Sequence, residues 1–188
     1  MSGVWVFVCG ASGAGKDSVM AWAQQRLAER PDVVFSRRVV TRETLPGADD
    51  TAVTPAQFDA LRLTGGLSWH WQAHGLRYGI GTHYASAVQE GRVVVVNGSR
   101  EHVQGLAPDA DIRVVQIVAE PRQLAHRLAQ RGRDDPQAVH TRLTRNARFE
   151  GLRTHHTVYN HGALADAGQQ LLAYLKDGLN TTGSQTTR

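Results

Sequence analysis

The chain has 188 residues, of which 41% are hydrophobic and 20% charged. This composition predicts one globular domain and excludes collagen-like, disulfide-scaffold and wholly disordered classes. Its 21 basic and 17 acidic residues give a net charge of +4, and the only lysines are Lys16 and Lys176. Because arginine binds phosphate in a bidentate manner, this balance favours an anionic partner. Cys9 is the single cysteine and lies in an apolar run, which predicts a buried thiol that carries no chemistry.

The sequence argues against membrane and nucleic-acid partners. No apolar run approaches the roughly 20 residues of a membrane-spanning helix, and residues 4–9 are too short for a signal peptide. We therefore expect a cytoplasmic protein. No basic run exceeds the pair Arg37 and Arg38, and no aromatic-rich motif of RNA-binding sheets occurs. The oligomeric state stays open.

The first half of the chain begins with a clear strand and helix. Residues 4–9 (VWVFVC) form a continuous apolar run that predicts a buried parallel strand. Residues 16–30 predict a helix that ends before Pro31, with an apolar face of Val19, Trp22, Ala23 and Leu27. Residues 33–41 are expected to be extended, and an exposed loop with Pro46 and Gly47 follows. At residues 54–57, the sequence TPAQ predicts a capping box that starts a short helix.

The second half continues to alternate strands and helices. Residues 65–81 have no clean period and are rich in glycine, aromatics and histidine, which suggests a functional segment or lid. The remaining pattern predicts strands at 93–96, 112–118 and 157–159, and helices at 121–131, 136–150 and 163–176. We expect an α/β fold with a central parallel sheet flanked by helices. Residues 180–188 predict a disordered tail.

A phosphate-binding loop follows the first strand. The segment GASGAGK fits the pattern G-x-x-x-x-G-K between a buried strand and a helix start. Its backbone N–H groups, helix N-terminus and lysine suit the phosphates of a nucleotide, which predicts ATP binding. The candidate nucleotide-binding residues are Gly10, Ala11, Ser12, Gly13, Ala14, Gly15, Lys16, Asp17 and Ser18.

The residue after the lysine departs from the common loop. Asp17 stands where most such loops carry the Ser or Thr that binds Mg²⁺, and Asn97 stands where a neighbouring strand commonly ends in aspartate. We interpret this exchange as an altered Mg²⁺ site that uses the Asp17 carboxylate. The alternative is that Asp17 only interacts with the helix dipole.

Arginines at helical spacing predict a lid over the transferring phosphate. Arg127 and Arg131 lie four residues apart, and Arg142 and Arg145 follow. Their guanidinium groups could neutralise developing charge and exclude water, so Arg127, Arg131 and Arg142 join Lys16 as candidate catalytic residues. The alternative is that these arginines lie on solvated helix faces.

Together these motifs resemble the guanylate kinase family and, more closely, the ribose 1,5-bisphosphate phosphokinases of phosphonate catabolism. The similarity spans nearly the whole chain and includes GASGAGKDS, VVTR, HWQAHGLRYGI and VNGSR. The resemblance implies a nucleoside-monophosphate-kinase-like P-loop domain over residues 1–179, with an acceptor-binding segment near 36–85 and a lid near 127–145. Guanylate kinases hold the acceptor phosphate with arginines of a Thr-Thr-Arg-x-Pro-Arg run, in which Arg42 matches the first arginine and Leu45 replaces the second. The glutamate with which that family reads guanine has no obvious counterpart in this chain.

The resemblance further implies transfer of a phosphoryl group from ATP to ribose 1,5-bisphosphate, giving 5-phosphoribosyl 1-diphosphate (PRPP). Guanylate kinase activity, a non-catalytic binding module and a switch-type ATPase remain alternatives. The implied partner is a phosphorylated sugar, whose hydroxyl groups Asp49 or Asp50 could bind. Zinc binding by His70 and His74 is less favoured than hydrogen bonding to the acceptor. The candidate acceptor-binding residues are Arg38, Arg42, Arg77, Tyr78, Asn97 and Ser99.

Overall fold

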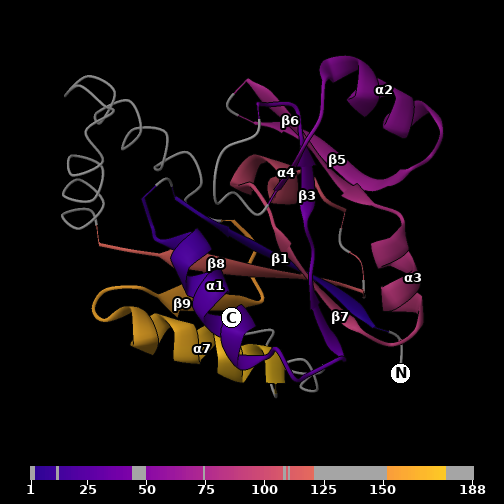
Figure 1. Ribbon diagram of the computed structural model, residues 1–188. Coiled ribbons are helices and arrows are strands. Elements are labelled where there is room, and N and C mark those ends of the chain that lie inside the picture. Colours follow the sequence, from indigo (N-terminus) through magenta and orange to yellow (C-terminus); the bar gives the residue numbers. More distant parts are fainter. Residues whose placement is uncertain are drawn as a thin grey trace, which may run out of the picture. The chain divides into compact units, whose positions relative to one another are not determined.

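The computed structural model describes residues 3–11, 13–43, 50–73, 75–107, 109, 111–120 and 152–176 (Figure 1). The strands are β1 (Val4–Gly10), β2 (Val33–Phe35), β3 (Arg38–Val40), β4 (Asp50–Ala52), β5 (Leu67–Ala73), β6 (Leu76–Gly81), β7 (Val93–Asn97), β8 (Ile112–Val118) and β9 (His156–Tyr159). The helices are α1 (Lys16–Arg26), α2 (Pro55–Leu63), α3 (His83–Gln89), α4 (Arg100–Gln104) and α7 (Leu164–Lys176). None of the helices described is long and apolar enough to span a membrane.

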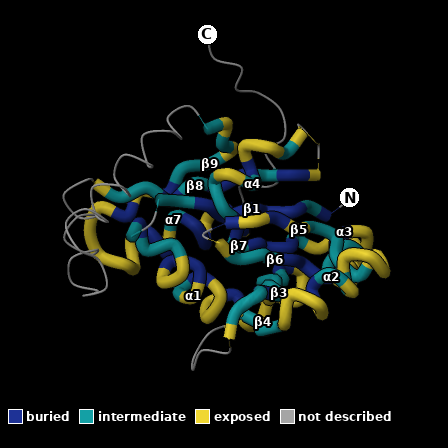
Figure 2. The backbone as a smooth tube through the Cα atoms, turned by 90° about the horizontal axis from the view of Figure 1, so that it is seen from above, coloured by how far each residue is buried: buried dark blue, intermediate teal, exposed yellow. Residues whose placement is uncertain are grey.

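The larger sheet has the strand order β2-β7-β1-β8-β9. Strand β1 pairs in parallel with β7, and Val8 is opposite Asn97, the last residue of β7. The pairs β2 with β7 and β8 with β9 are also parallel. In Figure 2 β1 and β7 are largely buried, and Phe7, Cys9 and Val95 are each 0% exposed. The parallel sheet and the buried Cys9 are therefore confirmed.

A second sheet, with order β4-β3-β6-β5, was not predicted. Strands β5 and β6 form an antiparallel hairpin whose turn contains Gly75 at φ 74°. Strand β5 (LSWHWQA) does alternate apolar and polar residues, and its exposed His70 and Gln72 alternate with the buried Trp71 and Ala73. Strand β6 (LRYGIG) instead ends in three consecutive buried residues, so the segment 65–81 as a whole has no single period. Helix α2 begins with the predicted capping box, because Thr54 and Gln57 exchange side-chain and backbone hydrogen bonds of 2.8 and 3.2 Å.

Contacts divide the chain into two compact units, and β1 and β8 each contribute to both. Unit 1 comprises Met1–Cys9 and Pro31–Val114, and unit 2 comprises Gly10–Arg30 and Val115–Arg188. Unit 1 therefore contains the second sheet and the segment expected to bind the acceptor. Unit 2 contains the phosphate loop. The expected single domain over residues 1–179 stays a prediction, and the predicted tail and the helices at 121–131 and 136–150 lie outside the described residues.

Within unit 2, helices α1 and α7 lie side by side (Figure 1). They approach closely where Gly168 of α7 meets the Trp22 ring of α1, since a Cβ at residue 168 would lie 2.4 Å from ring atoms. Glycine usually destabilises a helix interior relative to alanine. Here the absence of a side chain allows the two helices to pack.

Gly168→Ala should therefore destabilise the protein by about 1–3 kcal/mol, the usual cost of overpacking a core, rather than produce the usual helix-propensity gain. Urea unfolding measures the effect. Gly105→Ala is the control, because a Cβ there would lie no closer than 3.5 Å to its neighbours. A Gly168→Ala variant as stable as the parent would contradict the packing account.

Candidate functional site

The phosphate loop of unit 2 depends on glycine geometry at its exit. Gly13 and Gly15 have φ values of 87° and 81°, a left-handed conformation that side-chain-bearing residues rarely adopt. Gly15 is the N-cap of α1, and no side chain caps this helix. The first N–H groups of an uncapped helix are suited to an anion. The geometry therefore agrees with the predicted phosphate site; Ser12 lies outside the described residues.

Lys16 and Asp17 open helix α1 and contact each other. The Lys16 ammonium donates to Asp17 Oδ1 at 2.9 Å, and the Asp17 side chain is 79% exposed. Magnesium in kinase sites commonly takes one or two carboxylates together with substrate phosphates and water. An exposed carboxylate at the first turn of this helix fits such a site. Its role in holding Mg²⁺ stays a prediction.

Asn160, which sequence reasoning did not single out, supports the loop from within unit 2. It follows β9, is only 3% exposed, and its Nδ2 donates to the carbonyl oxygen of Ala14 at 2.7 Å. Its own backbone N–H donates to the Val118 carbonyl at the end of β8. The signal available in the sequence was a polar residue directly after the short strand predicted at 157–159. Asn160 thus links the loop to the neighbouring strand ends.

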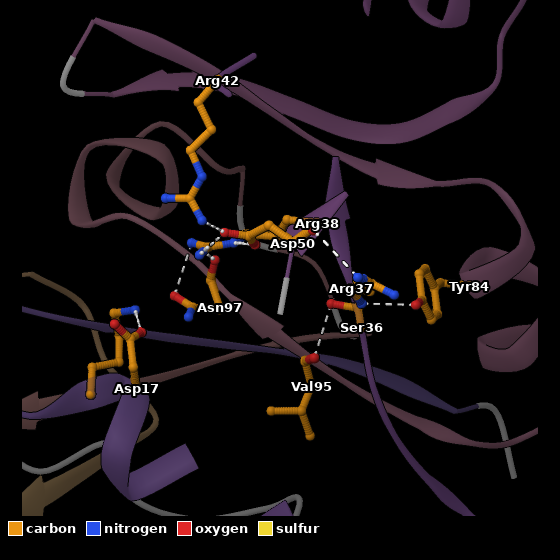
Figure 3. Close-up of polar contacts among 10 residues, drawn as sticks. Asp17, Ser36, Arg37, Arg38, Arg42, Asp50, Tyr84, Val95 and Asn97 are labelled. Atoms are coloured by element: carbon orange, nitrogen blue, oxygen red, sulfur yellow. Dashed lines mark hydrogen bonds and ion pairs between the residues drawn. The ribbon is translucent and has the colours of Figure 1, made fainter. Parts of the chain in front are cut away.

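A buried ion-pair cluster lies in unit 1 (Figure 3). Asp50, with a side chain only 6% exposed, accepts from Arg38 Nε at 2.9 Å and Nη2 at 3.3 Å, and from Arg42 Nη2 at 2.7 Å. Arg38 Nη1 also donates to the backbone oxygen and Oδ1 of Asn97, at 3.2 and 3.1 Å. The structure therefore brings together three candidate acceptor-binding residues, Arg38, Arg42 and Asn97. Asp50, one of the two aspartates considered for sugar hydroxyl groups, pairs here with both arginines.

Planar side chains stack behind Arg38. Its guanidinium carbon lies 5.2 Å from the Tyr78 ring centre, Trp71 stacks on Tyr78 at 5.6 Å, and His102 stacks on Trp71 at 4.7 Å. The pKa of His102 is lowered from 6.5 to about 4, first because burial removes it from water and second because His70 adds positive charge. At neutral pH the imidazole is uncharged, which suits its place among apolar rings.

Arg77 lies apart from this cluster. Its guanidinium pairs with Asp59 at 2.7 Å, donates to the Pro55 carbonyl at 3.0 Å, and lies 5.0 Å from the Phe58 ring centre. It lines a cavity of about 400 Å³ with His70, Gln72 and Arg62. Since neighbouring residues of a strand point to opposite faces, Arg77 and Tyr78 face opposite sides of β6. These guanidinium contacts are all with residues of α2, so Arg77 joins α2 to β6. A role of Arg77 in acceptor binding stays a prediction.

The other candidate site residues either have structural contacts or lie outside the described residues. Ser99 is the N-cap of α4, where its Oγ accepts from the His102 N–H at 3.1 Å. His70 lies on β5 rather than on a helix, and the described residues contain no group of three or more metal-binding side chains. Arg127, Arg131, Arg142, Arg145, Asp49 and His74 lie outside the described residues.

The fold and the loop define the class. The chain is similar to the crystal structure of guanylate kinase from Anaplasma phagocytophilum, with a TM-score of 0.70 that covers 96% of this chain and 88% of that one. At 15% identity this likeness concerns the fold alone. It confirms the expected α/β fold of P-loop nucleoside monophosphate kinases.

Sequence relatives define the family more narrowly. A ribose 1,5-bisphosphate phosphokinase PhnN from Pseudofrankia inefficax is 43% identical over 93% of this chain and 92% of its own length. Similarly named proteins from Agrobacterium fabrum and Burkholderia mallei are 37% and 38% identical, over 94% and 91% of this chain and 98% and 94% of their own lengths. No protein-family model matches. The chain belongs to the ribose 1,5-bisphosphate phosphokinase family, as its motifs suggested.

The lowered pKa of His102 predicts a pH dependence of stability. Below pH 6.5 the unfolded chain gains a proton at this residue, whereas the folded chain does not until about pH 4. The parent should therefore lose stability as the pH falls across this window. His102→Phe keeps a stacked ring without the titration, so urea unfolding at pH 7.5 and 5 should show a smaller loss. An equal loss in both proteins would contradict the assignment.

Removing the Asn160 bond should impair nucleotide binding. Asn160→Leu retains volume but loses the donor to Ala14, so we expect the KM for ATP to rise about tenfold, in line with about 1–2 kcal/mol for such a bond. Gln170→Leu is the matched control, because the side-chain hydrogen bonds of Gln170 within the described residues join it to the backbone of Tyr159 rather than to the loop. Equal KM values for the parent and Asn160→Leu would show that the bond does not shape the loop.

Proposed function

We propose that this chain transfers the terminal phosphoryl group of ATP to the 1-phosphate of ribose 1,5-bisphosphate, releasing ADP and forming PRPP. The observation that carries the proposal is 37–43% identity, over more than nine tenths of the chain, to relatives named for ribose 1,5-bisphosphate phosphokinase activity. The geometry suits that activity. It provides a phosphate loop in unit 2 and paired arginines in unit 1.

The reaction requires neutralisation of negative charge on the phosphates more than it requires proton abstraction. An oxygen of the acceptor's 1-phosphate attacks the terminal phosphorus of ATP, and the bond to the ADP oxygen breaks. The attacking oxygen already belongs to an anion at neutral pH, so no strong base is needed. Lys16 is 17% exposed at the loop and is proposed to neutralise the terminal phosphate. Arg42, 26% exposed, is proposed to hold an acceptor phosphate.

We assign ATP and Mg²⁺ as cofactors, a phosphorylated sugar as the partner, and the cytoplasm as the location. Bound Mg²⁺ would offset negative charge on the phosphates, and Asp17 is the residue proposed to hold it. Arg127, Arg131 and Arg142 are proposed lid residues that shield the transfer from water. We further propose that the activity serves phosphonate catabolism, as the family resemblance implies.

Acceptor discrimination tests the proposal. Coupled measurement of ADP release should give a kcat/KM for ribose 1,5-bisphosphate far above that for GMP, because a site that pairs with phosphates but does not read a purine discriminates strongly. Lys16→Ala should lose most of this turnover while keeping its unfolding midpoint. Comparable values with GMP would instead support guanylate kinase activity. ADP release that is independent of any acceptor would support an ATPase.

A further inference from the structure

The two arginines of the unit 1 cluster are not equivalent. Arg38 uses all three guanidinium nitrogens within the protein, with Nε and Nη2 on Asp50 and Nη1 on Asn97. Arg42 makes one such bond among the described residues, from Nη2 to Asp50. A guanidinium has five N–H donors. Arg42 therefore retains most of its donors for a ligand, whereas Arg38 is largely engaged.

The net charge of the cluster also distinguishes Arg42 from Arg38. The side chains of Arg38 and Asp50 form a two-point pair, 18% and 6% exposed, and this pair is close to neutral. Asp50 uses its second oxygen, Oδ2, on Arg42 as well, at 2.7 Å. Because Arg38 compensates the carboxylate, the net charge of about +1 resides with Arg42. A carboxylate this well paired has little capacity left for the hydroxyl groups of a sugar.

The strands that carry Asp50, Arg38 and Asn97 fix the position of the Asp50 carboxylate. Asp50 begins β4, Arg38 begins β3 directly beside it in register, and Asn97 ends β7. Arg38 is also backed by the Tyr78 ring at 5.2 Å. The carboxylate is thus fixed on one side by a strand pair and a stacked guanidinium. On the other side it limits the rotamers of Arg42, a long side chain whose ordering would otherwise be an entropic cost of binding.

We propose that Asp50 is a positioning residue of the acceptor site. Its carboxylate is held by Arg38, which Asn97 fixes in turn, and it aligns the Arg42 guanidinium, which alone of the two arginines contacts the acceptor's phosphate. This proposal rests on the proposed function and deepens it. It assigns Asp50 to alignment of a cation rather than to hydroxyl recognition, and it assigns Arg38 to support rather than to direct phosphate binding.

A double-mutant cycle tests the proposal with ATP and ribose 1,5-bisphosphate. Asp50→Asn should raise the acceptor KM about 5- to 10-fold, the scale of ordering one long side chain, and should leave the KM for ATP within about twofold. In an Arg42→Met background, the same Asp50→Asn change should alter the acceptor KM less than about twofold. Glu90→Gln, which removes a carboxylate from the exposed pair with Arg92 at 2.6 Å, is the control and should change neither KM.

Other outcomes overturn the proposal. An equal effect of Asp50→Asn in both backgrounds would mean that Asp50 contacts the acceptor itself. An unchanged or lowered acceptor KM would mean that Asp50 does not align Arg42, or that it competes with phosphate. If Asp50→Asn does not fold, Asp50→Glu keeps the charge but displaces it by one methylene, and the same selective rise is expected; no rise would overturn the proposal.

The proposed function is judged separately, by whether the unaltered chain turns over ribose 1,5-bisphosphate. If it uses another phosphorylated acceptor, the same cycle is measured with that compound. If it shows no turnover, calorimetric titration with ribose 5-phosphate measures the phosphate site directly. The dissociation constant should then rise with Asp50→Asn only when Arg42 is present. Equal constants for the parent and Asp50→Asn would overturn the proposal without reference to turnover.

Discussion

A buried carboxylate between two guanidinium groups organises the candidate acceptor site. Asp50 is 6% exposed, and a carboxylate so far from water is stable only when its oxygens are paired. Arg38 and Arg42 supply that pairing, and Asn97 fixes the far side of Arg38. The cluster joins the ends of β3, β4 and β7. Its chemistry therefore depends on strand pairing rather than on any single loop.

The phosphate loop offers mainly backbone N–H groups, rather than side-chain cations, to an anion. Its left-handed glycines turn the chain into an uncapped helix start, which leaves N–H groups for an anion. Support comes from Asn160, whose side chain binds the loop carbonyl of Ala14. Lys16, paired with Asp17 at 2.9 Å, adds a positive charge to these backbone groups. The candidate phosphate site in unit 2 thus rests on main-chain geometry, whereas the candidate acceptor site in unit 1 rests on paired side chains.

Local signals in the sequence predicted a large share of this structure. The apolar run of β1, the glycine loop and the Thr54 capping box each depend on neighbouring residues, and each was found where expected. The second sheet was missed because β3 and β4 are too short to show a period, and because the alternation of β5 was not recognised within a segment that lacks a period as a whole. The partnership of Asp50 with Arg38, twelve residues away, and of Asn160 with Ala14, far along the chain, depends on tertiary pairing that no local pattern encodes.

In the proposed reaction the 1-phosphate of the acceptor, rather than water or a sugar hydroxyl, receives the transferred phosphoryl group. The most direct measurement is phosphorus NMR of the product formed from ribose 1,5-bisphosphate and ATP labelled with ¹⁸O in its terminal phosphoryl group. The product should be a 1-diphosphate whose outer phosphorus carries the label, with one ADP formed for each product. Label found instead in inorganic phosphate, or in a monophosphate ester at a sugar hydroxyl, would contradict it.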